Sequence, residues 1–142
     1  MAKQVNVFME NKPGRIRAIT SLLREHHINI RALTIQDRGD YGMMKMIVDQ
    51  PADANLLLSE NGFASALKDI VAIQISDVAG GLHDFVTALE ETQTSIKDAY
   101  GFVIRNKEKA VFCLEVQNYE KIVKSAKEKG FNVLEDDELY EL

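Results

Sequence analysis

The chain has 142 residues, 46% of them apolar, and a formal net charge of −5. This length suits one domain or two small ones, and the apolar fraction is large enough for a packed core. The acidic balance, without a block of Lys and Arg, argues against nucleic acid or an anionic membrane surface as a partner. The sequence has neither a run long enough to span a membrane nor a signal peptide. The single cysteine, Cys113, lies in an apolar run and is expected in the core, so we predict a cytoplasmic protein.

The first half of the chain has the pattern strand, helix, strand, strand, helix, strand. The strand over residues 4–9 alternates apolar and polar residues, so one face should be buried. A helix is predicted from near Pro13, and a second begins at Pro51 and ends at Gly62. The remaining strands are expected at about 29–36, 43–48 and 63–68. The strand over 43–48 is apolar at nearly every residue, which favours a central position or contact with a partner.

The second half repeats this order. Strands are predicted over 70–75, over 95–104 with a break at Gly101, and over 110–116. A turn is expected at Asn106-Lys107-Glu108, and helices from about Gly81 and over 119–129. The last four residues, Leu139 to Leu142, are predicted to form the final strand.

Two tandem copies of a ferredoxin-like βαββαβ unit explain this order. The predicted fold class is therefore α+β, with antiparallel sheets that carry helices on one face. The predicted domains are 1–68 and 69–142, with no linker at the boundary. A domain of roughly seventy residues has only a marginal core, so we expect the halves to pack rigidly on each other.

One loop occurs in both halves and organises the chain. It runs from Glu10 to Ile16 and returns from Ser76 to Leu82, with Gly14 and Gly80 66 residues apart. Each copy follows an alternating strand and opens a helix. A glycine and free backbone N–H groups at a helix start suit a small anion such as a carboxylate. An ordinary strand-to-helix turn uses the same residue types, and duplication alone could copy such a turn.

Sequence patterns for catalysis or metal binding are absent. The three histidines, His26, His27 and His83, are predicted on the surface, and there is no Cys-x-x-Cys. There is no phosphate-binding glycine motif, and no nucleophile can be paired with a base. We therefore predict no enzyme activity, metal or cofactor.

The first loop and its surroundings resemble an ACT domain. The stretch from Val7 to Ile16, followed by His27-Ile28-Asn29-Ile30, is most similar to the regulatory subunits of acetolactate synthase, which carry Glu-Asn-x-x-Gly followed by Asn-Ile. The second loop resembles the general ACT form Asp-x-Pro-Gly-x-Leu, with Ala79 in place of proline. The resemblance implies a module that binds amino acids and regulates metabolic enzymes. Such modules usually pair, often edge to edge, with ligands between the loop of one and the second strand of its partner.

Site residues follow from this resemblance by position. Asn11 and Gly14 would contact the ligand from the loop, and Asn29 would face it from the second strand. The full predicted ligand-binding set is Asn11, Lys12, Pro13, Gly14, Arg15, Ile16, Asn29 and Ile30 in the first copy, and Asp77, Gly80, Gly81, Leu82, Ser95 and Ile96 in the second. Asp77 is negative where Asn11 is neutral, so it would repel a carboxylate but could accept a hydrogen bond from an ammonium group. The sites could bind in different orientations, or only one could bind.

Three functions are compatible with the sequence. The first is an amino-acid-binding regulatory protein that forms a homodimer or larger assembly. The second is a regulatory subunit of an amino-acid biosynthetic enzyme such as acetolactate synthase, with Met43, Met44 and Met46 at the interface or, on the other interpretation, in the core. The third is an acylphosphatase-type enzyme that would use Arg15 and Asn11.

Overall fold

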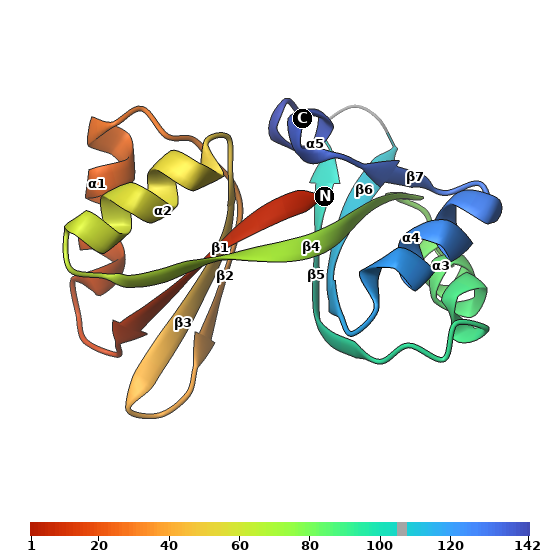
Figure 1. Cartoon of the computed structure of the whole chain (residues 1–142), viewed down its shortest axis with the longest axis horizontal. Coiled ribbons are helices and arrows are strands. Elements are labelled where there is room, and N and C mark those ends of the chain that lie inside the picture. Colours follow the sequence, from red (N-terminus) through yellow and green to blue (C-terminus); the bar gives the residue numbers. More distant parts are fainter. Residues whose placement is uncertain (105–107) are drawn as a thin grey trace. The chain divides into compact units, whose positions relative to one another are not determined.

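The structure, a computed structural model, describes residues 1–104 and 108–142 (Figure 1). The strands are β1 (Ala2–Glu10), β2 (Ile30–Asp37), β3 (Tyr41–Val48), β4 (Ala64–Ser76), β5 (Ile96–Ile104), β6 (Lys109–Val116) and β7 (Asn132–Leu134). The helices are α1 (Arg15–Glu25), α2 (Pro51–Glu60), α3 (Gly81–Glu90), α4 (Tyr119–Glu128) and α5 (Asp136–Tyr140). The described residues fall into two compact units. The first unit is Lys3–Lys68 with Glu141, and the second is Met1–Ala2, Asp69–Tyr140 and Leu142.

The first unit has the order β1-α1-β2-β3-α2-β4, with its strands side by side as β2-β3-β1-β4. Strand β3 is antiparallel to both of its neighbours. Alternate residues of β1 and β3 face the helices because side chains alternate between the faces of a strand. The core is built from the buried residues Val5, Val7, Ile19, Leu23, Ile28, Met44, Met46, Val48, Ala54 and Leu58. Met44 and Met46 are therefore core residues.

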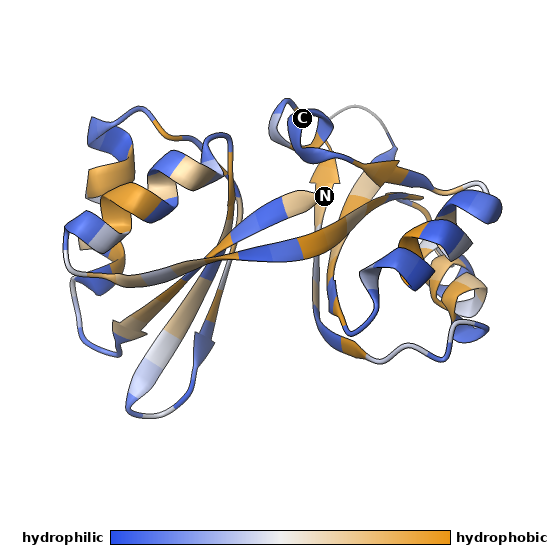
Figure 2. Ribbon diagram, viewed as in Figure 1, coloured by the Kyte–Doolittle hydropathy of each residue, from blue (hydrophilic) through white to orange (hydrophobic). Residues whose placement is uncertain are grey.

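The second unit repeats this plan as β4-α3-β5-β6-α4-β7, with the strand order β7-β4-β6-β5. Strand β4 is antiparallel to β6 and to β7. Helices α3 and α4 cover one face of the sheet, and Phe85, Leu89, Ile122 and Ala126 pack there against Val71, Ile73 and Leu114. Figure 2 shows hydrophobic and hydrophilic residues along the same helices, as expected for helices with one buried side. The predicted α+β class and the ferredoxin-like order are confirmed in both units.

Two predicted breaks in strands were wrong. The final strand of the first copy and the first strand of the second copy are one continuous strand, β4, which passes through Lys68 and Asp69. No glycine or proline occurs there to end it. Strand β5 likewise continues through Gly101, which pairs with Phe112, and its irregularity lies between Ile96 and Asp98. The separation into domains 1–68 and 69–142 stays a prediction.

The predicted C-terminal strand, Leu139 to Leu142, was also wrong. This region contains helix α5, and the last strand is β7. Three acidic residues occupy the first turn of α5, where they favour the positive end of the helix. The backbone N–H of Glu135 donates to Glu138 Oε2 at 3.1 Å, as in a capping box.

The burial of β1 differs from the expected alternation. Gln4 and Asn6 are buried, with exposed fractions of 1% and 5%, although we expected one face of this strand to be polar and exposed. Gln4 Nε2 donates to Asn6 Oδ1 at 2.6 Å, so the two amides satisfy part of each other's hydrogen-bonding capacity.

Other expectations on individual residues were confirmed. Cys113 is buried, and the three histidines are exposed. Of the predicted turn, Asn106 and Lys107 lie outside the described residues, whereas Glu108 is in a turn. Within the described residues, no helix is long and apolar enough to cross a membrane.

Candidate ligand-binding loops

Loop 1, residues 11–14, connects β1 to α1. Gly14 caps the helix in the left-handed conformation at φ +89°, which an L-residue rarely adopts. Its carbonyl accepts from the Ala18 N–H at 3.0 Å, and no side chain of the described residues caps the helix. A Cβ at Gly14 would meet no atom within 4 Å. The first turn of α1 therefore has backbone N–H groups without a side-chain acceptor, although the Arg15 N–H donates to the Lys12 carbonyl at 3.4 Å.

Loop 2, residues 77–80, has the same geometry before α3. Gly80 is left-handed at φ +90°, its carbonyl accepts from Asp84 N–H at 2.9 Å, and α3 likewise has no side-chain cap among the residues described. Gly81 has a separate constraint, because a Cβ there would lie 2.2 Å from the Ser76 carbonyl oxygen. The predicted equivalence of the two loops thus extends to their backbone conformation.

Helix α4 has a different N-terminus. Asn118 Oδ1 accepts from the Lys121 N–H at 3.0 Å, which satisfies one of the free donors of the first turn. Helix α2 also lacks a side-chain cap, so the feature that distinguishes α1 and α3 is the left-handed glycine at the N-cap. Pro51 lies in the first turn of α2 and has no backbone N–H, so this helix end has one free donor fewer.

The two loops carry opposite charges. In loop 1, the Glu10 carboxylate pairs with Lys12 Nζ and, at 3.8 Å, with Arg15 Nη2. The hydrogen bond from Lys12 and the two nearby cations lower the pKa of Glu10. The first turn of α1 has no acidic residue, whereas loop 2 contains Asp77 and α3 has Asp84 in its first turn. Loop 1 is therefore the better site for an anion.

The predicted strand residues lie far from the loop of their own copy. Glu10, next to loop 1, pairs with Tyr41, whereas Ile30 pairs with Val48 at the other end of β3. Strand β2 has eight residues, so its start and the loop are separated by roughly 26 Å along the sheet. Asn29 precedes this start, and its N–H donates to Asp49 Oδ1 at 2.9 Å.

The second unit has the same separation. Ser76, before loop 2, pairs with Lys109, whereas Ile96 pairs with Val116 at the opposite end of β6. Ser95 directly precedes Ile96 and is exposed. Within one unit, neither loop can share a small ligand with the strand residues predicted to complete its site.

In each unit, one residue of the predicted ligand-binding set lines a pocket. Arg15 and Glu10 line one of about 240 Å³ together with Phe8, Met9 and the turn from Asn61 to Ala64. Ile96 lines another, of about 360 Å³, with seven residues of α3 and the following turn: His83, Val86, Thr87, Leu89, Glu90, Gln93 and Thr94. The ligand-binding set predicted from the sequence did not include Glu10 or the Asn61–Ala64 turn. The sequence does carry a signal for this turn, because Gly62-Phe63 recurs as Gly130-Phe131.

Exposed apolar side chains near the predicted site lie in loop 2, where Val78 is 62% exposed, at the helix starts and on the edge strands. Ile16 is 43% exposed on α1 and Leu82 is 46% exposed on α3. Strands β2 and β5, at one edge of the sheet in their respective units, expose Leu33 and Ile35, and Ile96 and Val103.

The sequence profile of a family described as "ACT domain pair" matches residues 1–142. The chain is an ACT domain pair. This identification confirms the resemblance drawn from the loops, and an ACT domain pair is a regulatory module. None of the curated proteins matches the sequence.

Solved structures agree with this assignment. The ACT pair is similar to protein BT0572 from Bacteroides thetaiotaomicron, with 33% identity, coverage of 99% of this chain and 96% of that one, and a TM-score of 0.93. The ligand-free regulatory subunit of aspartate kinase from Thermus thermophilus shares the fold at 16% identity, with coverage of 90% and 92% and a TM-score of 0.65. The Thermus flavus regulatory subunit of aspartate kinase does so at 15%, with coverage of 89% and 90% and a TM-score of 0.62.

Proposed function

We propose that this ACT domain pair is a regulatory protein that binds a free amino acid at loop 1. The observation that carries the proposal is the uncapped first turn of α1 behind the left-handed Gly14, in a loop whose charge is positive. The carboxylate of an amino acid suits this turn, because backbone N–H groups and the helix dipole both favour a negative charge there. Asn11 and the neighbouring Lys12, Pro13, Arg15 and Ile16 would complete the loop side of the site.

The ammonium group of the ligand requires acceptors from elsewhere. Asn29 offers an amide oxygen, but it lies at the far end of β2 from loop 1 of its own unit. We therefore propose that a second chain supplies Asn29 and Ile30, so that the protein works as a homodimer or larger assembly. The exposed apolar residues of the β2 edge, Leu33 and Ile35, support this pairing.

Loop 2 is proposed as the weaker site. Asp77 would repel a ligand carboxylate, although its own carboxylate could accept from an ammonium group. Gly80, Gly81, Leu82, Ser95 and Ile96 would contribute if an amino acid binds there in the reverse orientation. If the two loops bind different amino acids, one chain could respond to two ligands.

A thermal-shift screen of the twenty amino acids tests the proposal. A ligand at a hundred times its dissociation constant stabilises the native state by about 2.7 kcal/mol, which raises the melting temperature by several degrees for a chain of this size. We expect at least one amino acid to give this shift at millimolar concentration. No shift with any of the twenty would reject the binding function and favour the alternative, a regulatory subunit of an amino-acid biosynthetic enzyme such as acetolactate synthase.

A further inference from the structure

A cavity in the second unit lies away from both loops. It has a volume of about 190 Å³ and is formed by α4, β7 and the second half of β4. Its walls are the apolar side chains of Ile70, Val71, Val123, Val133 and Leu134 and the ring of Tyr119. Apolar cavities of about 150 Å³ bind molecules of the size of benzene, so this volume admits a small hydrocarbon group.

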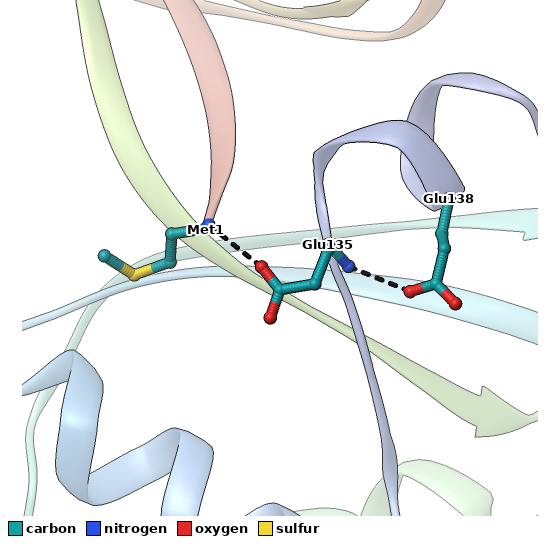
Figure 3. Close-up of polar contacts among 3 residues, drawn as sticks. All are labelled: Met1, Glu135 and Glu138. Carbon is teal, nitrogen blue, oxygen red and sulfur yellow. Dashed lines mark hydrogen bonds and ion pairs between the residues drawn. The ribbon is translucent and has the colours of Figure 1, made fainter.

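The mouth of the cavity carries carboxylates. Glu120 and Glu135 both line it, and both side chains are exposed. Glu135 Oε2 accepts from the ammonium group of Met1 at 2.9 Å, and the Glu135 N–H donates to Glu138, as Figure 3 shows. Glu120 makes no hydrogen bond or ion pair with any residue that the structure describes. One carboxylate at the mouth is thus neutralised and another is available.

Two further acidic residues lie near Tyr119, whose ring lines the cavity. Glu115 and Asp69 lie close enough to the Tyr119 hydroxyl that their charges add to burial in raising its pKa. The Tyr119 hydroxyl itself donates to the Asp69 carbonyl at 2.7 Å. Apart from Met1, the cation near enough to act on Glu135 is Lys127. Met1 and Lys127 therefore offset Glu135, and the carboxylate of Glu120 is the group at the mouth that repels anions and attracts cations.

We propose that this cavity binds a small primary amine with an aliphatic or aromatic body. The apolar body occupies the space between Val123 and Val133, and the ammonium group lies beside the carboxylate of Glu120, because Glu135 is already paired with Met1. Burial of the apolar body provides affinity, while the Glu120 carboxylate selects the charge. A carboxylic acid with the same apolar body would place its negative charge near Glu120 and bind more weakly. The site is separate from the loops and does not depend on their function.

Three small molecules of one shape test the charge preference. Isobutylamine, isobutyl alcohol and isovalerate carry the same isobutyl group on a positive, neutral or negative head. We would titrate each into the untagged chain and follow the backbone amides by heteronuclear NMR. The expected result is that the amine binds tightest and isovalerate weakest, with the largest shifts at Val123 and Val133. Equal affinities, tighter binding of isovalerate, shifts confined to other residues, or no binding at all would overturn the proposal.

Two variants separate the apolar and the charged contributions. Val123→Phe should fill the cavity and abolish binding of the amine, whereas Leu56→Phe, at a 58% exposed position on α2, should leave it unchanged. Glu120→Gln is exposed and should fold normally. It should weaken the amine roughly fivefold, the size of one exposed ion pair, and leave the alcohol unchanged. Unchanged amine affinity in both Val123→Phe and Glu120→Gln, with both proteins folded, would contradict the assignment.

Discussion

The thiol of Cys113 illustrates how burial controls a single residue. Cys113 is buried in the middle of β6 and pairs in register with Ala72 and Tyr100. Burial raises the pKa of the thiol to about 12, and the hydrogen bond with Tyr100 lowers it only in part. The reactive form of cysteine is the thiolate, so this thiol is both inaccessible and almost fully protonated at neutral pH.

We predict that Cys113 in the native protein reacts slowly with a thiol reagent. Labelling at neutral pH should require opening of β6, so its rate should rise steeply when denaturant is added. The measurement is absorbance after addition of an aromatic disulfide, with unfolded protein as the reference. Stoichiometric labelling of the native protein at the rate of the unfolded chain would disprove the core position of this residue.

Gly14 is the residue on which the proposed ligand site depends most directly. We predict that Gly14→Asp weakens the binding of an amino acid at loop 1, because its carboxylate would stand where the ligand carboxylate is expected. Two like charges 4 Å apart repel by about 1 kcal/mol in water and about 4 kcal/mol at an effective dielectric of 20. The expected loss of affinity in calorimetric titration therefore lies between about fivefold and about a thousandfold.

Gly14→Asn is the matched control for this variant. Asparagine has nearly the same shape as aspartate, has no charge and tolerates the left-handed conformation. It should retain more of the affinity than Gly14→Asp. Gly80→Asp, at the equivalent position of loop 2 with φ +90°, should leave binding at loop 1 nearly intact. Full affinity in a folded Gly14→Asp protein would mean that loop 1 is a turn and not a site.

At the scale of elements, the two strand-to-helix loops have the same backbone conformation but differ in the number of glycines that they require. Gly14 and Gly80 are required by a positive φ, with open space around them. Gly81 has no such φ; it is required because the chain passes close to the Ser76 carbonyl. This contact fixes the direction in which α3 leaves β4, so loop 2 depends on two glycines in succession.

We predict that Gly81→Ala destabilises the protein, because the new methyl group would force the backbone of Ser76 to move. Overpacking of this kind costs roughly 1–3 kcal/mol. Gly101→Ala, in β5 of the same unit, is the control, because its methyl would lie 3.4 Å from its nearest atoms and meet ordinary contacts. Denaturant unfolding should show a lower midpoint for Gly81→Ala and little change for Gly101→Ala. Equal midpoints would show that the backbone between β4 and α3 can move away from the new methyl group without loss of stability.

At the scale of the whole molecule, assembly decides whether a complete site can form. The start of β2 and loop 1 of the same unit are at opposite ends of the sheet, so no small ligand can touch both. An unpaired edge strand with exposed apolar residues is also prone to association. Strand β2 exposes Leu33 and Ile35, each at 44%.

We predict that the protein is a homodimer or larger and that Ile35→Lys dissociates it. Light scattering should give at least twice the chain mass of 16.0 kDa at micromolar concentration. Ile35→Lys would place a charge on the β2 edge, whereas Leu56→Lys, at a 58% exposed position on α2, should leave the assembly intact. A stable mass near 16.0 kDa for the unmodified chain, or a dimer unaffected by Ile35→Lys, would contradict assembly through this edge.

The sequence by itself determined the features that depend on local chemistry. Side-chain periodicity and glycine position predicted the repeated βαββαβ order, the equivalence of loops 1 and 2, and the burial of Cys113, because each follows from residues close in the chain. The family resemblance followed from the same loop. Even the C-terminal helix had a local signal, because the acidic residues before Leu139 suit the first turn of a helix.

Tertiary structure decided the features that depend on pairing between distant segments. The continuity of β4 depends on partners available on both sides of Lys68-Asp69, and the continuity of β5 depends on β6 opposite Gly101. The cavity between α4 and β7 exists only because these elements pack together. The largest consequence concerns the predicted site. Loop 1 and Asn29 are 15 to 18 residues apart in the sequence, yet strand register places them at opposite ends of the sheet, because β2 begins where β3 ends.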